Sequence, residues 1–408
     1  MKKNRVCMLL IGVLLLLSGC GKAQQAQNEA GNNFANSETT AESTPQQTTS
    51  EETTPEETTT EEVTTEQPTT VDLHEYDFTV CFAGDISLDE SAVTTAQLDA
   101  SANGIYDCIS PELLERMQQA DVMCLNNEFT FSTNGSPLPN KMYTFRANPT
   151  RVSVLQEMGV DIVSLANNHV YDYGEQALLD TFKTLTDAGI DYVGAGKNLA
   201  EAMRPVYYEI DGKTVAFVAA SRAEKYKMTP QATEDAPGIL RCYDTELFLQ
   251  TIAEADANAD FVIAYVHWGT EYSYELEDVQ LSTGKDYLNA GADVVIGAHS
   301  HCLQGMEYYD GKPIIYSMGN YWFNNKTLDS MLIELHFSGN DEGGELEVSV
   351  VPAIQSGAKT QIVTGDEKER IFSFLEDISM NVEVDENGVV REETTEGPEE
   401  VSGENVVE

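Results

Sequence analysis

Basic residues are scarce in this chain of 408 residues: 23 Lys and Arg stand against 69 Asp and Glu, which gives a formal net charge of -46. Proteins hold phosphate backbones and anionic lipid headgroups mainly with Lys and Arg. The shortage therefore argues strongly against nucleic acid as a partner and against adsorption to a membrane through a basic surface. Much of the acidity lies near the two ends, so the middle is a more ordinary acidic domain.

Cysteine is also sparse, and no two cysteines form a CxxC pair. Beyond Cys7 and Cys20 only five occur, an odd number without the spacing of a disulfide scaffold or a zinc ribbon. Cys81 and Cys124 lie in apolar, strand-like runs, where a free cysteine usually acts as a small buried side chain. We expect no obligatory disulfide.

The apolar run at residues 6–17 is too short to span a bilayer comfortably. Three basic residues precede it, which is typical of a secretory signal peptide. It ends in Leu17-Ser18-Gly19-Cys20, which resembles the lipobox of bacterial lipoproteins and implies cleavage before Cys20 and lipidation of that residue. A plain signal peptide or a short anchor helix is the alternative. We expect an extracytoplasmic protein anchored to the cell membrane as a lipoprotein through Cys20.

The composition divides the chain into four segments. A lipoprotein signal peptide at 1–20 precedes residues 21–75, which are mainly Thr, Glu, Gln, Ser and Pro with almost no large apolar side chains. Such a segment cannot bury enough surface to offset its ordering entropy, so we predict a disordered stalk. Residues 76–380 have the texture of a folded domain, and the acidic residues 381–408 are predicted to form a disordered tail.

Within 76–380, short apolar runs alternate with helical patterns. The continuous runs, typical of strands buried on both faces, are 78–83, 122–125, 161–166, 215–220, 261–266, 294–298 and 313–318. The helical patterns are 111–120, 149–158, 174–188, 244–257 and 276–290. This alternation predicts a layered α/β fold. The runs 330–337 and 344–351 alternate more, as antiparallel strands do.

Polar residues follow five of these runs directly. The segments are Gly84-Asp85, Asn126-Asn127-Glu128, Asn167-Asn168-His169, His267-Trp268-Gly269 and His299-Ser300-His301. Ligands of α/β sheets bind beyond the carboxyl ends of strands, so these groups could converge on one crevice. Together they offer a ligand set suited to zinc, manganese or iron. Each residue alone has an ordinary alternative; Asp172, for example, has the spacing of a helix cap with Glu175.

With Tyr316-Ser317-Met318-Gly319-Asn320, these segments resemble, in order, the motifs of the CapA poly-γ-glutamate capsule-synthesis family, from about Thr79 to about Gln355. That family is similar in turn to the calcineurin-like metallophosphoesterases. The resemblance implies an α/β fold, a four-layer α/β/β/α sandwich of the metallophosphoesterase type with a two-metal site. It implies the following roles: Asp85 and His301 on the first metal, Glu128 bridging, Asn168, His267 and His299 on the second metal, and His169 protonating a leaving oxygen.

Three positions bear on how such a site would work. Arg146 could clamp an anionic substrate group, and a surface ion pair is an equal alternative. Ser87 stands where metallophosphoesterases usually have the His of Asp-x-His, and Glu128 replaces the usual bridging Asp. We therefore expect one or two divalent ions, Mn, Zn or Fe.

The resemblance implies a role in poly-γ-glutamate capsule synthesis or export, with poly-γ-glutamate and membrane-embedded capsule synthase subunits as partners. Paired cations activate water and stabilise charge in an in-line displacement, which favours a metal-dependent hydrolase of the metallophosphoesterase type. The alternative is a metal-dependent phosphoesterase that acts on a cell-envelope substrate unrelated to capsule. A surface lipoprotein with a decayed site is a third, weaker hypothesis, because six candidate ligands are retained together.

Overall fold

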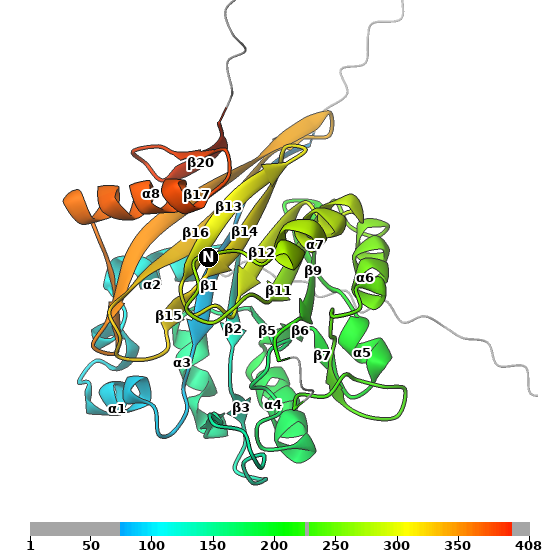
Figure 1. The fold of residues 1–408 in the computed structure, drawn as a ribbon, viewed down its shortest axis with the longest axis vertical. Helices are drawn as coiled ribbons and strands as arrows, with labels where there is room; N and C mark the ends of the chain where they lie inside the picture. The colour runs from blue at the N-terminus through cyan, green and yellow to red at the C-terminus, as the bar shows by residue number, and fades with distance from the viewer. Residues whose placement is uncertain (1–73, 225–227, 394–408) are drawn as a thin grey trace, which may run out of the picture. The chain divides into compact units, whose positions relative to one another are not determined.

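The computed structural model describes residues 74–224 and 228–393. The predicted signal peptide, Cys20 and nearly all of the predicted stalk lie outside the described residues. Two β-sheets lie face to face in the described part, with helices on their outer faces (Figure 1). In the same part, no helix is both long enough and apolar enough to cross a bilayer.

The larger sheet contains ten strands within the described residues, eight of them in the order β19-β20-β17-β16-β1-β2-β5-β6. The bounds are β1 Glu75–Ile86, β2 Val122–Asn127, β5 Ile162–Ser164, β6 Asp191–Val193, β15 Asn320–Trp322, β16 Leu328–Asn340, β17 Gly343–Ser356, β18 Lys359–Ile362, β19 Val382–Val384 and β20 Val389–Glu392. Strands β1, β2, β5 and β6 run parallel, whereas β16 and β17 form a long antiparallel pair beside them. The short strand β15 pairs with the end of β1.

The smaller sheet has the order β13-β14-β12-β11-β9-β8. The bounds are β8 Val206–Ile210, β9 Lys213–Ser221, β11 Phe261–His267, β12 Val294–Ala298, β13 Leu303–Tyr309 and β14 Lys312–Met318. Two two-stranded ladders complete the strands of the described part: β3 Thr130–Phe131 with β4 Arg146–Ala147, and β7 Ala195–Gly196 with β10 Gly238–Ile239.

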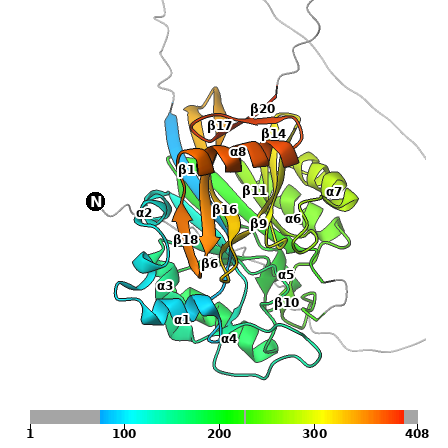
Figure 2. The same cartoon turned by 60° about the vertical axis from the view of Figure 1, so that its left-hand side comes forward.

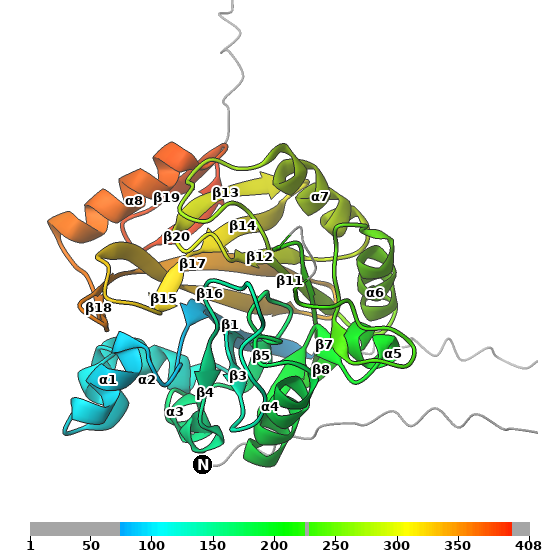
Figure 3. The same ribbon diagram turned by 60° about the horizontal axis from the view of Figure 1, so that its bottom comes forward.

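Helices cover the outer faces of both sheets, and one further helix, Asp366–Ile378, packs against the apolar cluster between the sheets. Their bounds are α1 Val93–Ala100, α2 Pro111–Gln119, α3 Val152–Glu157, α4 Glu175–Ala188, α5 Leu199–Met203, α6 Glu246–Asp256, α7 Asp278–Asn289 and α8 Asp366–Ile378. Helices α2, α3 and α4 share an apolar cluster with the larger sheet, and α6 and α7 share another with the smaller sheet. Figure 3 shows α6 and α7 away from α3 and α4, with the strands between them.

Alternation along β1 shows how one strand serves two layers. Phe78, Val80 and Phe82 point into the apolar cluster between the two sheets, while Cys81 and Ala83 face the helices. Because both faces are covered, the strand reads as a continuous apolar run. The predicted four-layer α/β/β/α sandwich is confirmed. Each of the seven continuous runs contains a strand or lies within one, and each of the five helical patterns contains a helix.

The predicted boundary at residue 381 is wrong. Strands β19 and β20 lie beyond it and pair with each other, and β20 also pairs with β17, so the fold continues to Glu392. Val382, Val384 and Val390 are buried in the same cluster as the apolar face of α8, which Figure 2 shows crossing in front of the sheets. Acidic residues surround these few valines, so composition hides the strands. The rest of the predicted tail, residues 394–408, lies outside the described residues.

Candidate metal centre

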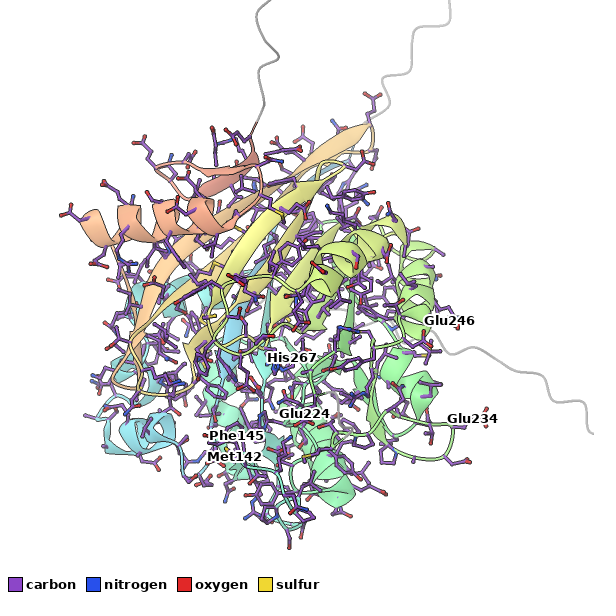
Figure 4. All side chains as sticks on the ribbon, viewed as in Figure 1. Met142, Phe145, Glu224, Glu234, Glu246 and His267 are labelled. Atoms are coloured by element: carbon purple, nitrogen blue, oxygen red, sulfur yellow. The ribbon has the colours of Figure 1, made fainter. Side chains whose placement is uncertain are left out.

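The polar residues predicted to converge stand at the carboxyl ends of strands from both sheets. Asp85 lies near the end of β1, where the register against β2 shifts after Ala83. Glu128 follows β2, and His267 is the last residue of β11. A register shift such as the one before Asp85 re-aims a side chain at the rim of a sheet. Figure 4 labels His267 near the middle of the molecule, above Glu224 and Phe145.

Two groups of three buried side chains meet at Glu128. The first triad is Asp85, Glu128 and His301, and the second triad is Glu128, His267 and His299; in each, the ligand atoms all lie within 4.8 Å of one another. Glu128 Oε1 is 3.6 Å from His267 Nε2 and 3.9 Å from His301 Nε2. The geometry therefore offers two adjacent cation sites that share one carboxylate.

Asn168 adds an oxygen to the second triad. Its Oδ1 atom lies 2.8 Å from His267 Nε2, and its side chain is buried. The structure thus brings together all six predicted ligands: Asp85, Glu128, Asn168, His267, His299 and His301. We call these residues the six-residue cluster.

Atoms of the cluster without hydrogen bonds fit a bound cation. Asp85 Oδ2, Glu128 Oε1 and His299 Nδ1 are buried and make no hydrogen bond among the described residues. Buried polar atoms without partners are rare because they cost free energy. Two carboxylates, imidazoles and an amide oxygen are the donors that zinc, manganese and iron accept. The residues present could hold a metal ion, and when bound it would supply Lewis-acid chemistry.

Burial and charge shift the acid–base properties of the cluster. Burial, reinforced by the Asp85 carboxylate, raises the pKa of Glu128 well above its ordinary value. Burial, with neighbouring histidines, lowers the pKa values of His267 and His299 well below the ordinary range, so both imidazoles are neutral at pH 7 and ready to bind metal. Burial also opposes a charge on His301, but Glu128 and Asp85 outweigh it and raise the pKa of His301 to about 9.

Asparagines behind the carboxylates fix their orientation. Asn126 Nδ2 donates to Asp85 Oδ1 at 2.7 Å and to Glu128 Oε2 at 3.2 Å. Asn167 Nδ2 in turn donates to Asn126 Oδ1 at 3.0 Å. Asn126 and Asn167 were not predicted as site residues, although both stand in the polar segments after strands. Their position there was a usable signal.

His169 belongs to a charged chain beside the cluster. Its Nε2 atom is 3.9 Å from Glu128 Oε1, and its Nδ1 atom is 2.7 Å from Asp172 Oδ2. Burial lowers the pKa of His169, while Asp172 opposes that shift. The alternative of Asp172 as a helix cap is wrong: α4 begins at Glu175 after Gly174, without a side-chain cap.

Lys141 completes this chain and was not predicted. Its side chain is 5% exposed, and Nζ lies 2.8 Å from Asp172 Oδ1 and 2.9 Å from Glu224 Oε1. Nζ also donates to the backbone carbonyl of Asn168. Lys141 follows no strand of the predicted sheet, so no local pattern indicates that it reaches the centre.

Phe145 and Phe323 form an apolar wall over the imidazoles. The ring centroid of Phe145 lies 4.3 Å from that of His169, and the ring centroid of Phe323 lies 4.7 Å from that of His301. The centroids of the two phenyl rings are 5.5 Å apart. Apolar rings limit water near the cluster, which strengthens electrostatic interactions there. Neither phenylalanine was predicted, because its role depends on how two loops meet.

The predicted clamp of Arg146 on an anionic substrate group stays a prediction, and its contacts among the described residues do not include the alternative ion pair. Its guanidinium lies 4.2 Å above the Tyr173 ring, and Nη1 donates to the carbonyl of Asn134 at 3.3 Å.

Ser87 is buried, and its hydroxyl accepts a hydrogen bond from the backbone of Asp89 at 3.3 Å. The Ser87 hydroxyl thus stabilises a local turn.

Comparison with known proteins identifies the family of this chain. Residues 79–325 match the family described as "Bacterial capsule synthesis protein PGA_cap". The "PGA biosynthesis protein CapA" of Bacillus subtilis (strain 168) is 30% identical over 266 residues, which cover 64% of this chain and 68% of that protein. The "Capsule biosynthesis protein CapA" of Bacillus anthracis is 34% identical over 237 residues, 56% of each chain.

Among solved structures, a 5′-nucleotidase from Candida albicans SC5314 is similar with a TM-score of 0.35 and 13% sequence identity, covering 62% of this chain and 47% of that one. This chain spans little more than half of the Bacillus anthracis relative. The matched family region covers more than half of this chain and contains every member of the six-residue cluster. The predicted resemblance is confirmed, and the chain belongs to the bacterial capsule synthesis protein PGA_cap family.

Proposed function

We propose that this protein acts in the synthesis or export of a poly-γ-glutamate capsule, as a membrane-anchored extracytoplasmic component. Family membership and the names of the two Bacillus relatives support the role in capsule synthesis. The lipobox-like segment ending at Cys20 supports the anchor and the location. Membrane-embedded capsule synthase subunits are the proposed protein partners.

The net charge of the chain bears on its encounter with such a polymer. Poly-γ-glutamate is anionic, and a chain of charge -46 would repel it. Bound cations reverse the sign of a local field and let an anionic group approach. A cation in the six-residue cluster would therefore serve recognition as well as chemistry.

For the chemistry, we propose metal-dependent hydrolysis of the metallophosphoesterase type. The observation that carries this proposal is the pair of buried triads that share Glu128. Beside them His169 can deliver a proton to a leaving oxygen, since its Nε2 atom faces Glu128 and its Nδ1 atom is held by Asp172. Phe145 and Phe323 limit water around the reacting groups.

Elemental analysis of the purified full chain tests the metal centre. We expect one or two Mn, Zn or Fe ions per chain in the wild type, and fewer in the His267→Ala variant. His336→Ala is the matched control, because His336 is partly exposed and its ring pairs with Asp77 outside the cluster. A wild-type protein that binds none of these ions, even after incubation with them, would refute the centre.

Two further measurements separate the parts of the proposal. Chelator treatment should abolish cleavage of a model phosphodiester, and added Mn²⁺ should restore it; cleavage that survives chelation contradicts metal-dependent hydrolysis. Deletion of the gene should remove capsular poly-γ-glutamate. Unchanged capsule together with metal-dependent cleavage would favour the alternative of a phosphoesterase acting on another cell-envelope substrate. Cys20→Ser should release the protein from the membrane fraction if Cys20 is the lipid anchor.

A further inference from the structure

Asn320 stands beside the first triad. It is the first residue of β15 and the parallel partner of Asp85 in β1. The backbone N–H of Asp85 donates to the Gly319 carbonyl at 2.9 Å, and the N–H of Ser87 donates to the Trp322 carbonyl at 3.0 Å. Hydrogen bonds on both sides of Asn320 therefore tie β15 to the strand that carries Asp85.

Two glycines make this approach of β15 to β1 possible. A Cβ atom at Gly84 would overlap the carbonyl oxygen of Gly319. Gly319 itself has φ 63°, and its own Cβ would lie 2.7 Å from the backbone carbon of Cys302. L-residues with side chains rarely adopt that backbone conformation. The position of Asn320 is thus fixed against both Asp85 and the turn that carries His301.

The amide of Asn320 acts on His301. Asn320 is fully buried, and its Oδ1 atom lies 2.8 Å from His301 Nδ1. A histidine that gives its Nδ1–H to an acceptor keeps the Nε2 lone pair for a cation. His301 Nε2 lies 3.9 Å from Glu128 Oε1, so this nitrogen points toward the other ligands of the first triad.

The first triad depends on such support more than the second. In the second triad, Asn168 adds an oxygen beside His267. In the first triad, Ser87 stands where a further ligand is usual, and its hydroxyl accepts a hydrogen bond from the backbone N–H of Asp89. The orientation of His301 therefore decides how well a cation is held there.

We infer that Asn320 is the positioning residue of the first triad: its carbonyl oxygen accepts the Nδ1–H of His301 and presents Nε2 to a divalent cation. This inference rests on the proposed metal centre. Partners that orient metal-binding histidines typically change metal affinity 10–100-fold when removed. Asp85 Oδ2 makes no hydrogen bond, but it lies 3.2 Å from the same Nδ1 atom. At that distance Asp85 is the competing partner of Nδ1, and an experiment must exclude it.

Selective ¹⁵N-histidine labelling of the full chain tests the contact directly, because the sequence has only six histidines. In the wild type we expect a downfield Nδ1–H signal that is absent from His301→Gln and exchanges slowly with water. Asn320→Leu, which lacks the acceptor, should lose the slow exchange, and Asn320→Asp should keep it. Asn320→Ser, too short to reach His301, replaces Asn320→Leu if circular dichroism shows that the leucine variant is unfolded.

Calorimetric titration with Mn²⁺ or Zn²⁺ gives the second readout. Asn320→Leu should weaken one of two binding events 10–100-fold and leave the other within twofold, whereas Asn320→Asp should bind more tightly than Asn320→Leu. Asn289→Leu is the control, the same substitution at the exposed end of α7. Slow exchange and both affinities preserved in Asn320→Leu would overturn the inference. A wild type that binds no metal refutes the proposed centre, and the histidine signals still decide whether Asn320 holds His301.

Discussion

Substituting Glu128 by Gln should make the metal-free protein more stable and should lower its affinity for divalent metal ions. Glu128 belongs to both triads, and its Oε1 atom is buried without a hydrogen bond. The Asn126 amide nitrogen donates to both Glu128 and Asp85, which holds the two carboxylates close together. Gln keeps the shape of Glu and removes the negative charge, so the repulsion from Asp85 disappears.

The magnitude follows from the charges involved. Two like charges about 5 Å apart repel by about 3 kcal/mol at an effective dielectric constant of about 20. His301, whose pKa is raised to about 9 by these carboxylates, offsets part of this repulsion in the wild type. We therefore expect Glu128→Gln to raise the free energy of unfolding of the metal-free protein by about 1–3 kcal/mol at pH 7–8. The unfolding midpoint should rise by roughly 2–8 °C.

The pH dependence has a definite sign. Because the pKa of Glu128 is raised in the folded state, the folded protein keeps this proton at pH values where the unfolded chain has released it. The contribution of Glu128 to stability is then full below its ordinary pKa of 4.5 and falls as the pH rises toward the folded-state value. The difference between the variant and the wild type should therefore widen from pH 4.5 upward.

Calorimetric unfolding of chelator-treated protein between pH 4 and pH 8 measures this difference. In the same proteins, Mn²⁺ should bind the variant at least about a hundredfold more weakly, which is roughly 2.7 kcal/mol, because both triads lose their shared charge. Asn289→Gln, on the surface, is the control. A metal-free variant less stable than the wild type, or one that binds two ions with wild-type affinity, would refute the reasoning.

Three other predictions concern separate features of the molecule. Asp172→Asn removes the carboxylate that holds His169, so metal-dependent cleavage of a model phosphodiester should fall about 10–100-fold with unchanged metal content; equal loss of metal would contradict this division of roles. Gly84→Ala should cost at least about 3 kcal/mol of stability, because its Cβ would overlap a backbone carbonyl, and urea unfolding measures the loss. Arg151 lowers the pKa values of Glu90 and Asp99, so Arg151→Ala should reduce the free energy of unfolding by at most about 1 kcal/mol per pair at pH 7. The difference between variant and wild type should vanish as the pH falls through those lowered pKa values. A difference that persists at pH 2 would exclude the ion pairs as its cause.

The strands that carry the site could be predicted because each is buried on both faces. Phe78, Val80 and Phe82 face one layer and Cys81 faces another, so the sequence shows an unbroken apolar run. The polar residue after such a run stands at the edge where ligands bind. Every member of the six-residue cluster stands in such a polar segment, whereas the role expected of each came from the resemblance to the CapA family.

Other parts of the site depend on contacts between distant loops. Lys141 reaches Asp172 and Glu224 from a segment without periodicity, and the spacing of Asp172 to Glu175 matches a helix cap that does not form. Asn320 gains its role from the pairing of β15 with β1, across more than two hundred residues of sequence. Local pattern reports burial and the ends of elements, whereas these contacts follow from the way the loops fold over the sheets.

A cation in this cluster would join the two sheets of the sandwich. Asp85 lies in β1 and Glu128 directly follows β2 of the larger sheet, whereas His267 ends β11 and His299 directly follows β12 of the smaller sheet. Without metal, the carboxylates repel each other and buried atoms lack partners, so we expect a weaker contact between the sheets at this edge. Binding energy that relieves this cost adds directly to folding stability. Metal binding and the packing of the two sheets should therefore be coupled, and removal of metal should loosen the carboxyl ends of β1 and β11 before the apolar cluster between the sheets.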